Sequence, residues 1–224
     1  MTSRFGPLST TRYVANGVPF NMVRVPPGRL ADSDGAHKRE LLISRPFELG
    51  VTLVTQALWR AVTGNNPSLY QGDDYPVERV SWDHVQAFLG QLEALGLLGF
   101  RLPTDAEWVW AARCGVAARW AGADRAEAVA VVNVSQTAPV ASLSGSAVGA
   151  LDLSGNVVER QSDAWSDEPV AGVDVQNHPW EFSRISRGGG WSGISYFARV
   201  NQRHITPLQR ANTSLGLRLA RTTP

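Results

Sequence analysis

Hydrophobic and polar positions alternate in two short runs near the N-terminus. Residues 20–25 alternate and are followed by the turn-forming sequence Pro-Pro-Gly at residues 26–28, and a second extended run covers residues 39–43. We predict a strand for each run and a polar loop at residues 31–37 between them. Asp32 and Asp34 in this loop suggest an EF-hand, but the remaining ligands and the closing Glu are missing, so we predict no metal there.

Two segments with helical spacing of apolar residues follow. Residues 55–63 place apolar side chains on one face and stop at the Gly-Asn-Asn-Pro sequence that begins at Gly64. Ser81 is a good N-cap for a second helix, and Asp83 lies in its first turn. Apolar residues then recur at i, i+3, i+4 and i+7 before Gly96, namely Val85, Phe88, Leu89 and Leu92.

A third helix is predicted by a capping box. Thr104 and Glu107 are spaced so that each side chain can bond the backbone amide of the other, and the helix should run to about Arg113. Beyond Cys114 only short β-like runs occur, broken by Gly, Ser, Asn and Pro. Because we find no internal repeat and no low-complexity linker, we predict one α+β domain over residues 1–224, with a loop-rich second half.

Composition excludes several classes of function. The chain has 224 residues, a formal net charge of +1 and 18% charged residues. This charge creates no field that would attract nucleic acid or anionic lipid, so we predict neither as an obligatory partner. The single cysteine, Cys114, excludes an intramolecular disulfide and a cysteine-based zinc cluster.

Targeting signals are not evident. The first residues lack the apolar core of a signal peptide, and no segment approaches the roughly 20 apolar residues of a membrane span. We therefore predict no signal peptide, no membrane span and a cytoplasmic location. Display on the surface of a cell or phage stays an alternative, because a protein assembled into a larger particle needs no signal of its own.

Six motifs occur in one order along the chain, at residues 47–59, 64–68, 76–82, 101–108, 155–159 and 187–191. The most specific are Arg-Leu-Pro-Thr-x-Ala-Glu-Trp and Gly-Asn-Val-x-Glu. Together they resemble the formylglycine-generating enzyme, or sulfatase-modifying factor, family over nearly the whole chain. The resemblance implies the C-type-lectin-like fold as elaborated in that family, with a small twisted antiparallel sheet, two main helices and a loop-rich second half.

The catalytic residues of that family are missing from the motif pattern. Its enzymes oxidise a substrate cysteine with two active-site cysteines at a copper site, and by alignment these positions are Gly193 and Ala198 here. Cys114 does not replace them, because the C-terminal end of a helix disfavours a thiolate, and we interpret it as a packed apolar residue. The four histidines have no spacing for the iron of the related sulfoxide synthases: His37, His84, His178 and His204. We therefore predict no enzyme activity and neither copper nor iron.

The C-terminal segment, residues 187–220, resembles a second group, the variable proteins of diversity-generating retroelements. The Arg-Gly-Gly-Gly-Trp sequence, the later arginines and the closing Gly-Leu-Arg-Leu have the spacing seen in that group. In those proteins a reverse transcriptase rewrites adenine-containing codons, and the changed residues form a binding face. The resemblance implies these variable, ligand-binding positions: Ser192, Gly193, Ile194, Tyr196, Phe197, Asn201, Gln202, His204, Ile205, Leu208, Gln209, Asn212 and Thr213.

The residue types in this segment independently favour a binding face. Tyr196 and Phe197 are rigid aromatics that can anchor an interface, and hydroxyl and amide side chains beside them offer adaptable hydrogen bonds. We expect the arginines of the segment, Arg199, Arg203, Arg210 and Arg218, to pair with the scaffold. The predicted function is therefore non-catalytic binding of a protein or surface glycan of unknown identity. Two alternatives are a pseudoenzyme with fixed partners and a formylglycine-generating oxidase with a displaced nucleophile.

A calcium site is the one cofactor prediction. Residues 152–159 carry two carboxylates around a tight loop, an oxygen set that suits calcium. The resemblance to the family's calcium loops implies side-chain ligands Asp152 and Glu159 and carbonyl ligands Gly155 and Val157. Where the family usually continues with Trp, Arg160 stands here, and its charge is an alternative to the ion.

Overall fold

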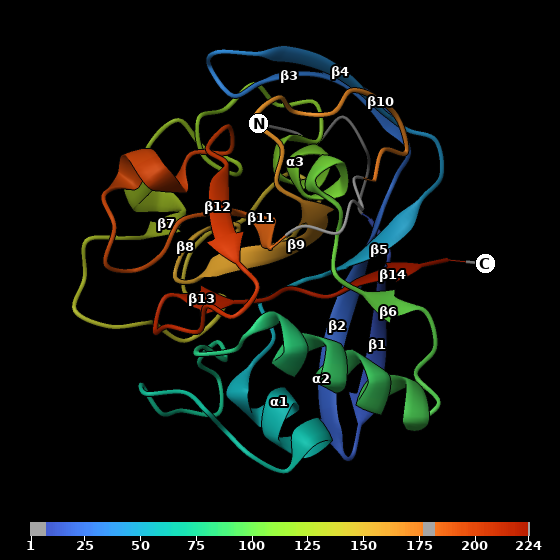
Figure 1. The fold of residues 1–224 in the computed structure, drawn as a ribbon, viewed down its shortest axis with the longest axis vertical. Helices are drawn as coiled ribbons and strands as arrows, with labels where there is room; N and C mark the ends of the chain where they lie inside the picture. The colour runs from blue at the N-terminus through green and yellow to red at the C-terminus, as the bar shows by residue number, and fades with distance from the viewer. Residues whose placement is uncertain (1–7, 177–181, 224) are drawn as a thin grey trace.

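The computed structural model describes residues 8–176 and 182–223, and its main sheet joins the two ends of that chain (Figure 1). The strand order is β1-β2-β5-β14-β6, and every neighbouring pair is antiparallel. The bounds are β1 (Thr10–Ala15), β2 (Val18–Val25), β5 (Phe47–Gly50), β6 (Phe100–Arg101) and β14 (Ala220–Thr222). The strand predicted at residues 20–25 is confirmed as part of β2. The C-terminal strand β14 lies between β5 and β6, so the sheet is completed only by the last described residues.

A smaller sheet has the order β10-β4-β3, from β3 (Gly28–Ser33), β4 (Lys38–Ile43) and β10 (Gly172–Val173). The strand predicted at residues 39–43 is confirmed, but the loop prediction for residues 31–33 is wrong, because these residues pair with β4. Asp32 is buried there, and its Oδ2 accepts a 3.0 Å hydrogen bond from Arg39 Nε. The Asp32 carboxylate, which we predicted to lie in a polar loop, is thus engaged in an ion pair between the antiparallel strands β3 and β4.

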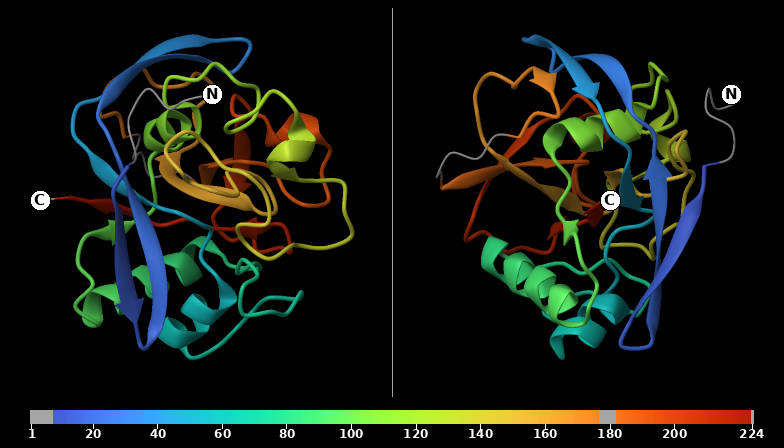
Figure 2. Two further views of the ribbon diagram at one scale, coloured as in Figure 1. Left: turned by 180° about the vertical axis from the view of Figure 1, so that it is seen from behind. Right: turned by 90° about the vertical axis from the view of Figure 1, so that its right-hand side faces the viewer.

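Within residues 8–176 and 182–223 the chain forms three α-helices, at the three segments where the sequence predicted helices. They are α1 (Gln56–Thr63), α2 (Trp82–Ala94) and α3 (Asp105–Arg113). The predicted N-caps Ser81 and Thr104 are confirmed, and Thr55 caps α1. Helices α1 and α2 pack together against strands of the main sheet at one end of the molecule, whereas α3 packs on β3, β4 and β9 at the other (Figures 1 and 2). None of the helices in the described ranges is long and apolar enough to cross a membrane.

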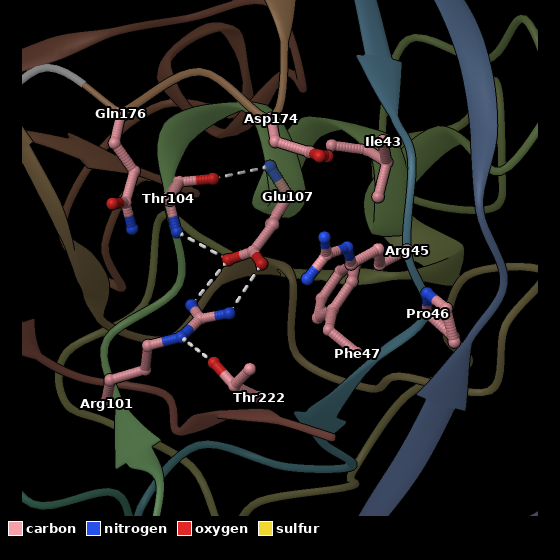
Figure 3. Close-up of a pocket in the computed structure, with 10 residues that line it drawn as sticks. All are labelled: Ile43, Arg45, Pro46, Phe47, Arg101, Thr104, Glu107, Asp174, Gln176 and Thr222. Atoms are coloured by element: carbon pink, nitrogen blue, oxygen red, sulfur yellow. Dashed lines mark hydrogen bonds and ion pairs between the residues drawn. The ribbon is translucent and has the colours of Figure 1, made fainter. Parts of the chain in front are cut away.

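The capping box of α3 is extended by an arginine (Figure 3). Glu107 Oε2 accepts a 2.9 Å hydrogen bond from the Thr104 amide, and the Glu107 amide donates to Thr104 Oγ1 at 3.1 Å. Arg101 binds the same carboxylate through Nη1 and Nη2, each at 2.7 Å. This cluster lines a cavity of about 250 Å³ between the start of α3 and strand β5.

We expect Glu107→Ala to lower the free energy of unfolding by about 2 kcal/mol, the upper end of the range for helix caps, because Arg101 loses its partner as well. Urea unfolding measures the change. Glu93→Ala, an exposed glutamate on α2, is the matched control and should stay within about 0.5 kcal/mol of the parent protein. A Glu107 variant as stable as the control would contradict this start of α3.

The second half is rich in loops, as predicted, and is organised by a four-stranded sheet of order β12-β11-β9-β13. Its strands are β9 (Val158–Ala164), β11 (Ser183–Arg187), β12 (His204–Pro207) and β13 (Leu215–Gly216), and β13 pairs with β9 in parallel. A two-stranded parallel pair, β7 (Ala130–Val131) and β8 (Ser154–Gly155), lies beside it. Beyond α3, the helical segments among the described residues are the short 3₁₀ turns η1 (Ala126–Ala128) and η2 (Ser195–Ala198).

Glycine at residue 189 fixes where η2 lies. Gly189 has a φ of +69°, and a Cβ added there would lie 2.9 Å from the backbone of Ala198. Since a side chain would both strain this conformation and push against η2, only glycine allows β11 and η2 to approach so closely. The glycine run after β11 therefore sets the position of Tyr196 and Phe197.

Candidate ligand-binding face

The glycines and arginines of the motifs in residues 187–220 form the frame of the C-terminal segment. The first arginine that holds this frame in place is Arg187, at the end of β11. Its Nε and Nη2 bind the two oxygens of Asp105, the first residue of α3, at 2.6 and 2.9 Å. Its Nη1 donates to the carbonyls of Val200 and Gln202 at 3.0 and 3.1 Å. Burial alone would raise the pKa of Asp105, but Arg187 and Arg39 outweigh it and hold that pKa well below its ordinary value. The buried ion pair between Arg187 and Asp105 therefore connects the four-stranded sheet with α3, and Arg187 also binds the loop after η2.

Arg218 is the second arginine of this kind. It lies between β13 of the four-stranded sheet and β14 of the main sheet. Its Nε and Nη2 bind Glu159 Oε2 and Oε1 at 2.8 and 3.0 Å, and both side chains are fully buried. Trp108 Nε1 also donates to Glu159 Oε2, at 2.9 Å. The remaining guanidinium donors reach the carbonyls of Gly50 and Leu151, at 2.8 and 2.6 Å. The carboxylate and the guanidinium thus satisfy each other inside the core.

These contacts test the predicted calcium ligands. Both oxygens of Glu159 are bound by Arg218, and Asp152 accepts the Ala141 amide at 2.9 Å, so the two carboxylates do not converge on a free cation position. Within residues 8–176 and 182–223, no group of three or more acidic, histidine or cysteine side chains could hold a metal ion. Glu159 therefore does not fit as a calcium ligand. Calcium at the carbonyls of Gly155 and Val157 stays a prediction.

The cation beside Glu159 is not the one that the sequence suggested. Arg160 was the predicted substitute for the ion, but it donates to the carbonyls of Val80 and Pro207, away from the loop. Burial lowers the pKa of Arg160 to about 10. Arg218, from the segment between β13 and β14 and 59 residues further along the chain, holds the position instead.

The other predicted arginine contacts divide evenly. Arg218 pairs with the scaffold as expected, and Arg203 does so too, donating from Nη2 to the Ser166 carbonyl at 2.8 Å. Arg199 and Arg210 depart from the expectation, because neither side chain has a hydrogen bond or ion pair to any residue that the structure describes. Arg199 instead stacks over aromatic rings, and Arg210 is exposed.

The predicted variable residues all lie at least partly at the surface. The exposed ones are Ser192, Ile194, Tyr196, Phe197, Ile205 and Gln209. The half-buried ones are Gly193, Asn201, Gln202, His204, Leu208, Asn212 and Thr213. By contrast, the frame residues between and beside them are buried: Arg187, Gly188, Gly189, Gly190, Ala198, Val200 and residues 215–220. Exposure therefore separates the positions proposed to vary from most of the frame, whereas Trp191, Arg199 and Arg203 are half-buried and Arg210 is exposed.

Aromatic side chains gather on η2, the orange-red turn near β7 in Figure 1. The rings of Tyr196 and Phe197 meet edge to face with centroids 5.6 Å apart, and His204 lies next to Phe197 at 6.1 Å. His204 Nε2 donates to the Phe197 carbonyl at 3.1 Å. Burial lowers the pKa of His204, so the imidazole is neutral at pH 7 and presents Nδ1 as an acceptor. The side chain of Ile194, which is 59% exposed, adds aliphatic surface.

A cavity of about 370 Å³ lies beside this cluster, where β12 meets the loop before β13. Five of the predicted residues line it: Ser192, Gly193, His204, Ile205 and Asn212. Ser214, Thr206 and Arg210 also line it, and the sequence analysis did not assign them to the site. Tyr196 and Phe197 do not line this cavity. The candidate face thus combines an apolar projection with a polar hollow, a combination that protein interfaces use.

Phe182 is a further surface residue that sequence reasoning missed. Its side chain is 92% exposed, and its carbonyl accepts the Leu208 amide at 2.9 Å, which places it next to a predicted variable position. It precedes the glycine-rich motif, so motif spacing carried no signal for it.

The comparisons with known proteins agree with this architecture. The family model for the sulfatase-modifying factor enzyme 1-like domain matches residues 12–223, and the chain belongs to this family. The solved structure of Treponema denticola variable protein 1 is similar, with a TM-score of 0.87 and 26% sequence identity, and the match covers 95% of this chain and 98% of that one. Both resemblances drawn from the motifs, and the C-type-lectin-like fold, are therefore confirmed.

Two further relatives are named as a chaperone protein and as a formylglycine-generating enzyme. The chaperone protein LppX of Paenibacillus barcinonensis is 26% identical, with 91% of this chain and 90% of that protein covered. The formylglycine-generating enzyme of Mus musculus is 27% identical over 95% of this chain. The chain covers 61% of the mouse enzyme, less than two thirds of its length.

Proposed function

We propose that this chain is a non-catalytic ligand-binding protein that displays a diversified face, as the variable proteins of diversity-generating retroelements do. The observation that carries the proposal is the division of residues 187–220 into buried frame positions and exposed or half-buried predicted variable positions. Interior substitutions cost about 1–3 kcal/mol or more each, so several together would exceed the stability of a domain. Only a surface of this kind tolerates repeated rewriting.

The residues at the family's catalytic positions support the non-catalytic part of the proposal. Gly193 and Ala198 replace the two cysteines, and Ala198, the last residue of η2, is fully buried. Cys114 is buried at the end of α3, and burial raises the pKa of its thiol to about 11, so the thiolate is scarce at neutral pH. The alternative, an oxidase of the formylglycine-generating type, predicts that the protein consumes oxygen when a cysteine-containing peptide is added. Measuring oxygen uptake with such a peptide tests that alternative.

The decisive experiment exchanges the predicted variable residues together. We expect simultaneous replacement of Ser192, Ile194, Phe197, Asn201 and Ile205 to leave the melting temperature within a few degrees of the parent, because four of them are exposed and Asn201 is half-buried. Binding profiles on protein and glycan arrays should change completely. Val200→Ser, one buried neighbour, is the control and should cost about 1–3 kcal/mol by itself. Failure of the multiple variant to fold, or an unchanged binding profile, would overturn the proposal.

The match to a protein named as a chaperone favours one second candidate, a pseudoenzyme with fixed partners. The exposed apolar residues on η2 would then bind one client. The gene separates the two: a variable protein predicts a near-copy of the 3′ end downstream, with adenines at the differing positions, and a reverse transcriptase gene nearby. A fixed-partner protein predicts neither.

A further inference from the structure

A second cavity, of about 320 Å³, lies next to the candidate face and carries an excess of positive charge. It is lined by Arg113, Arg119 and Arg199, with Asp124 and Asn201. Asn201 is a predicted variable residue, whereas the three arginines lie outside that set. The cavity therefore joins the candidate face to a part of the molecule that is not expected to vary.

Arg199 is held rigidly at this cavity without a charged partner. Its ζ carbon lies 4.8 Å from the centroid of the Tyr196 ring and 5.4 Å from that of Trp120. Its Nε is buried with no hydrogen-bond partner among the described residues. Stacking on Trp120, which lies outside the predicted variable positions, limits the conformations of the guanidinium in every version of the face, and Tyr196 adds to this in the present one. Less entropy is therefore lost when the guanidinium binds a ligand.

The neighbouring groups do not neutralise Arg199. Arg119 is exposed, and its side chain makes no ion pair or hydrogen bond within the described part of the chain. Arg113 Nη1 donates to the Ala118 carbonyl at 3.4 Å, and its Nε lies 3.7 Å from Asp32 Oδ1. The one carboxylate of the lining, Asp124, accepts the Arg119 backbone amide at 3.2 Å. Two guanidinium groups thus remain available to an anion.

The surroundings indicate what kind of anion. Residues 182–223 contain no Asp or Glu, so the candidate face offers no acidic competitor for these arginines. Arg199 stacks on Tyr196, whose ring meets that of Phe197, and both of these aromatic side chains are exposed, which favours burial against apolar side chains of a partner. Guanidinium groups match the planar geometry of a carboxylate. A protein segment with an acidic side chain next to apolar ones meets all three conditions.

We propose that the Arg113–Arg119–Arg199 cavity is a constant carboxylate-binding subsite at the edge of the variable face, which receives an Asp or Glu side chain of the bound protein. The proposal rests on the proposed function, since it assigns to that face an anchor that stays while the rest varies. Different versions of the face would then select partners that share one acidic residue.

The test uses a blocked Glu-Leu-Phe peptide and its Gln-Leu-Phe counterpart, titrated into the full chain by NMR. We expect about tenfold preference for the Glu peptide, the effect of a hydrogen bond to a charged group, and loss of that preference in R119Q/R199Q. R125Q is the matched control, because Arg125 is 85% exposed and does not line the cavity. R119Q alone, which removes an unpaired surface side chain, should give part of the loss and keeps the test valid if the double variant fails to fold.

Several outcomes would overturn the subsite. Equal binding of the two peptides, or a preference that survives R119Q and R119Q/R199Q, excludes it. If inorganic sulfate or a sialic acid binds the cavity and the Glu peptide does not, the arginines bind another class of ligand, and a protein carboxylate as the ligand is rejected. Exchange of Ile194, Phe197 and Ile205 separates the two proposals. The preference for the Glu peptide should persist in this variant. If the binding profile changes but no preference for the Glu peptide is seen, the subsite alone is rejected.

Discussion

Glu159→Gln should lower the free energy of unfolding by about 3–5 kcal/mol, the range found when one partner of a buried ion pair is removed. The change leaves the Arg218 guanidinium, which is fully buried, without a compensating charge. Arg218 also holds the carbonyls of Gly50 and Leu151, so the loss should loosen the junction between the main sheet and the segment that precedes β8. Urea unfolding at pH 7 gives the free energy.

Glu127→Gln is the matched control for this pair. Glu127 lies 3.9 Å from Arg125 at the surface, and both side chains are at least 80% exposed, so its loss should cost less than about 1 kcal/mol. Replacing Glu159 and Arg218 together with Met and Leu should be less damaging than Glu159→Gln, because no lone charge is left inside. A Glu159 variant as stable as the control would mean that water or another group neutralises Arg218.

Asp105→Asn should destabilise the protein at pH 7 by about 3 kcal/mol or more, and this difference should shrink in acid. Arg187 and Arg39 hold the pKa of Asp105 below its ordinary value of 3.8 although burial acts in the opposite direction. A carboxyl group with a lowered folded-state pKa stabilises the fold fully above the unfolded-state pKa. That contribution is lost as pH falls below about 4 and through the folded-state pKa.

Urea midpoints measured from pH 7 to pH 2 test the sign of this linkage. The parent should lose stability below about pH 4, and the Asn variant should show a flatter profile that approaches it. Asp73→Asn, which removes an exposed partner of Arg60, serves as the control and should leave the profile almost unchanged. A difference between parent and Asp105→Asn that stays constant over the whole range would contradict the role of this charge.

The two ion pairs are compatible with the variable face that we propose. Arg187 and Arg218 satisfy buried carboxylates and main-chain carbonyls on either side of the predicted variable positions. Because these contacts use no exposed side chain of the face, substitutions there leave them intact. The stability of the frame and the chemistry of the face are thus set by different residues.

Local elements could be predicted well from the chain alone. Thr55, Ser81 and Thr104 cap helices whose apolar residues recur at helical spacing, and both signals act over a few residues. The two N-terminal strand runs and the motifs that identify the family are local in the same sense. The sequence also separated frame from face in residues 187–220, because glycines and arginines alternate there with residue types that suit an interface.

Long-range pairing could not be predicted. Arg218 rather than Arg160 stands beside Glu159, and Asp32 lies in a buried strand rather than in a loop. The Arg199 cavity likewise needs α3, the loop after it and η2 to meet.

The sequence by itself therefore determined the elements and the family, and it predicted a set of variable positions, since these depend on neighbouring residues and on motif spacing. Only the tertiary structure decided which charges meet, because partners such as Asp105 and Arg187 are 82 residues apart and their pairing depends on how the sheets and α3 pack.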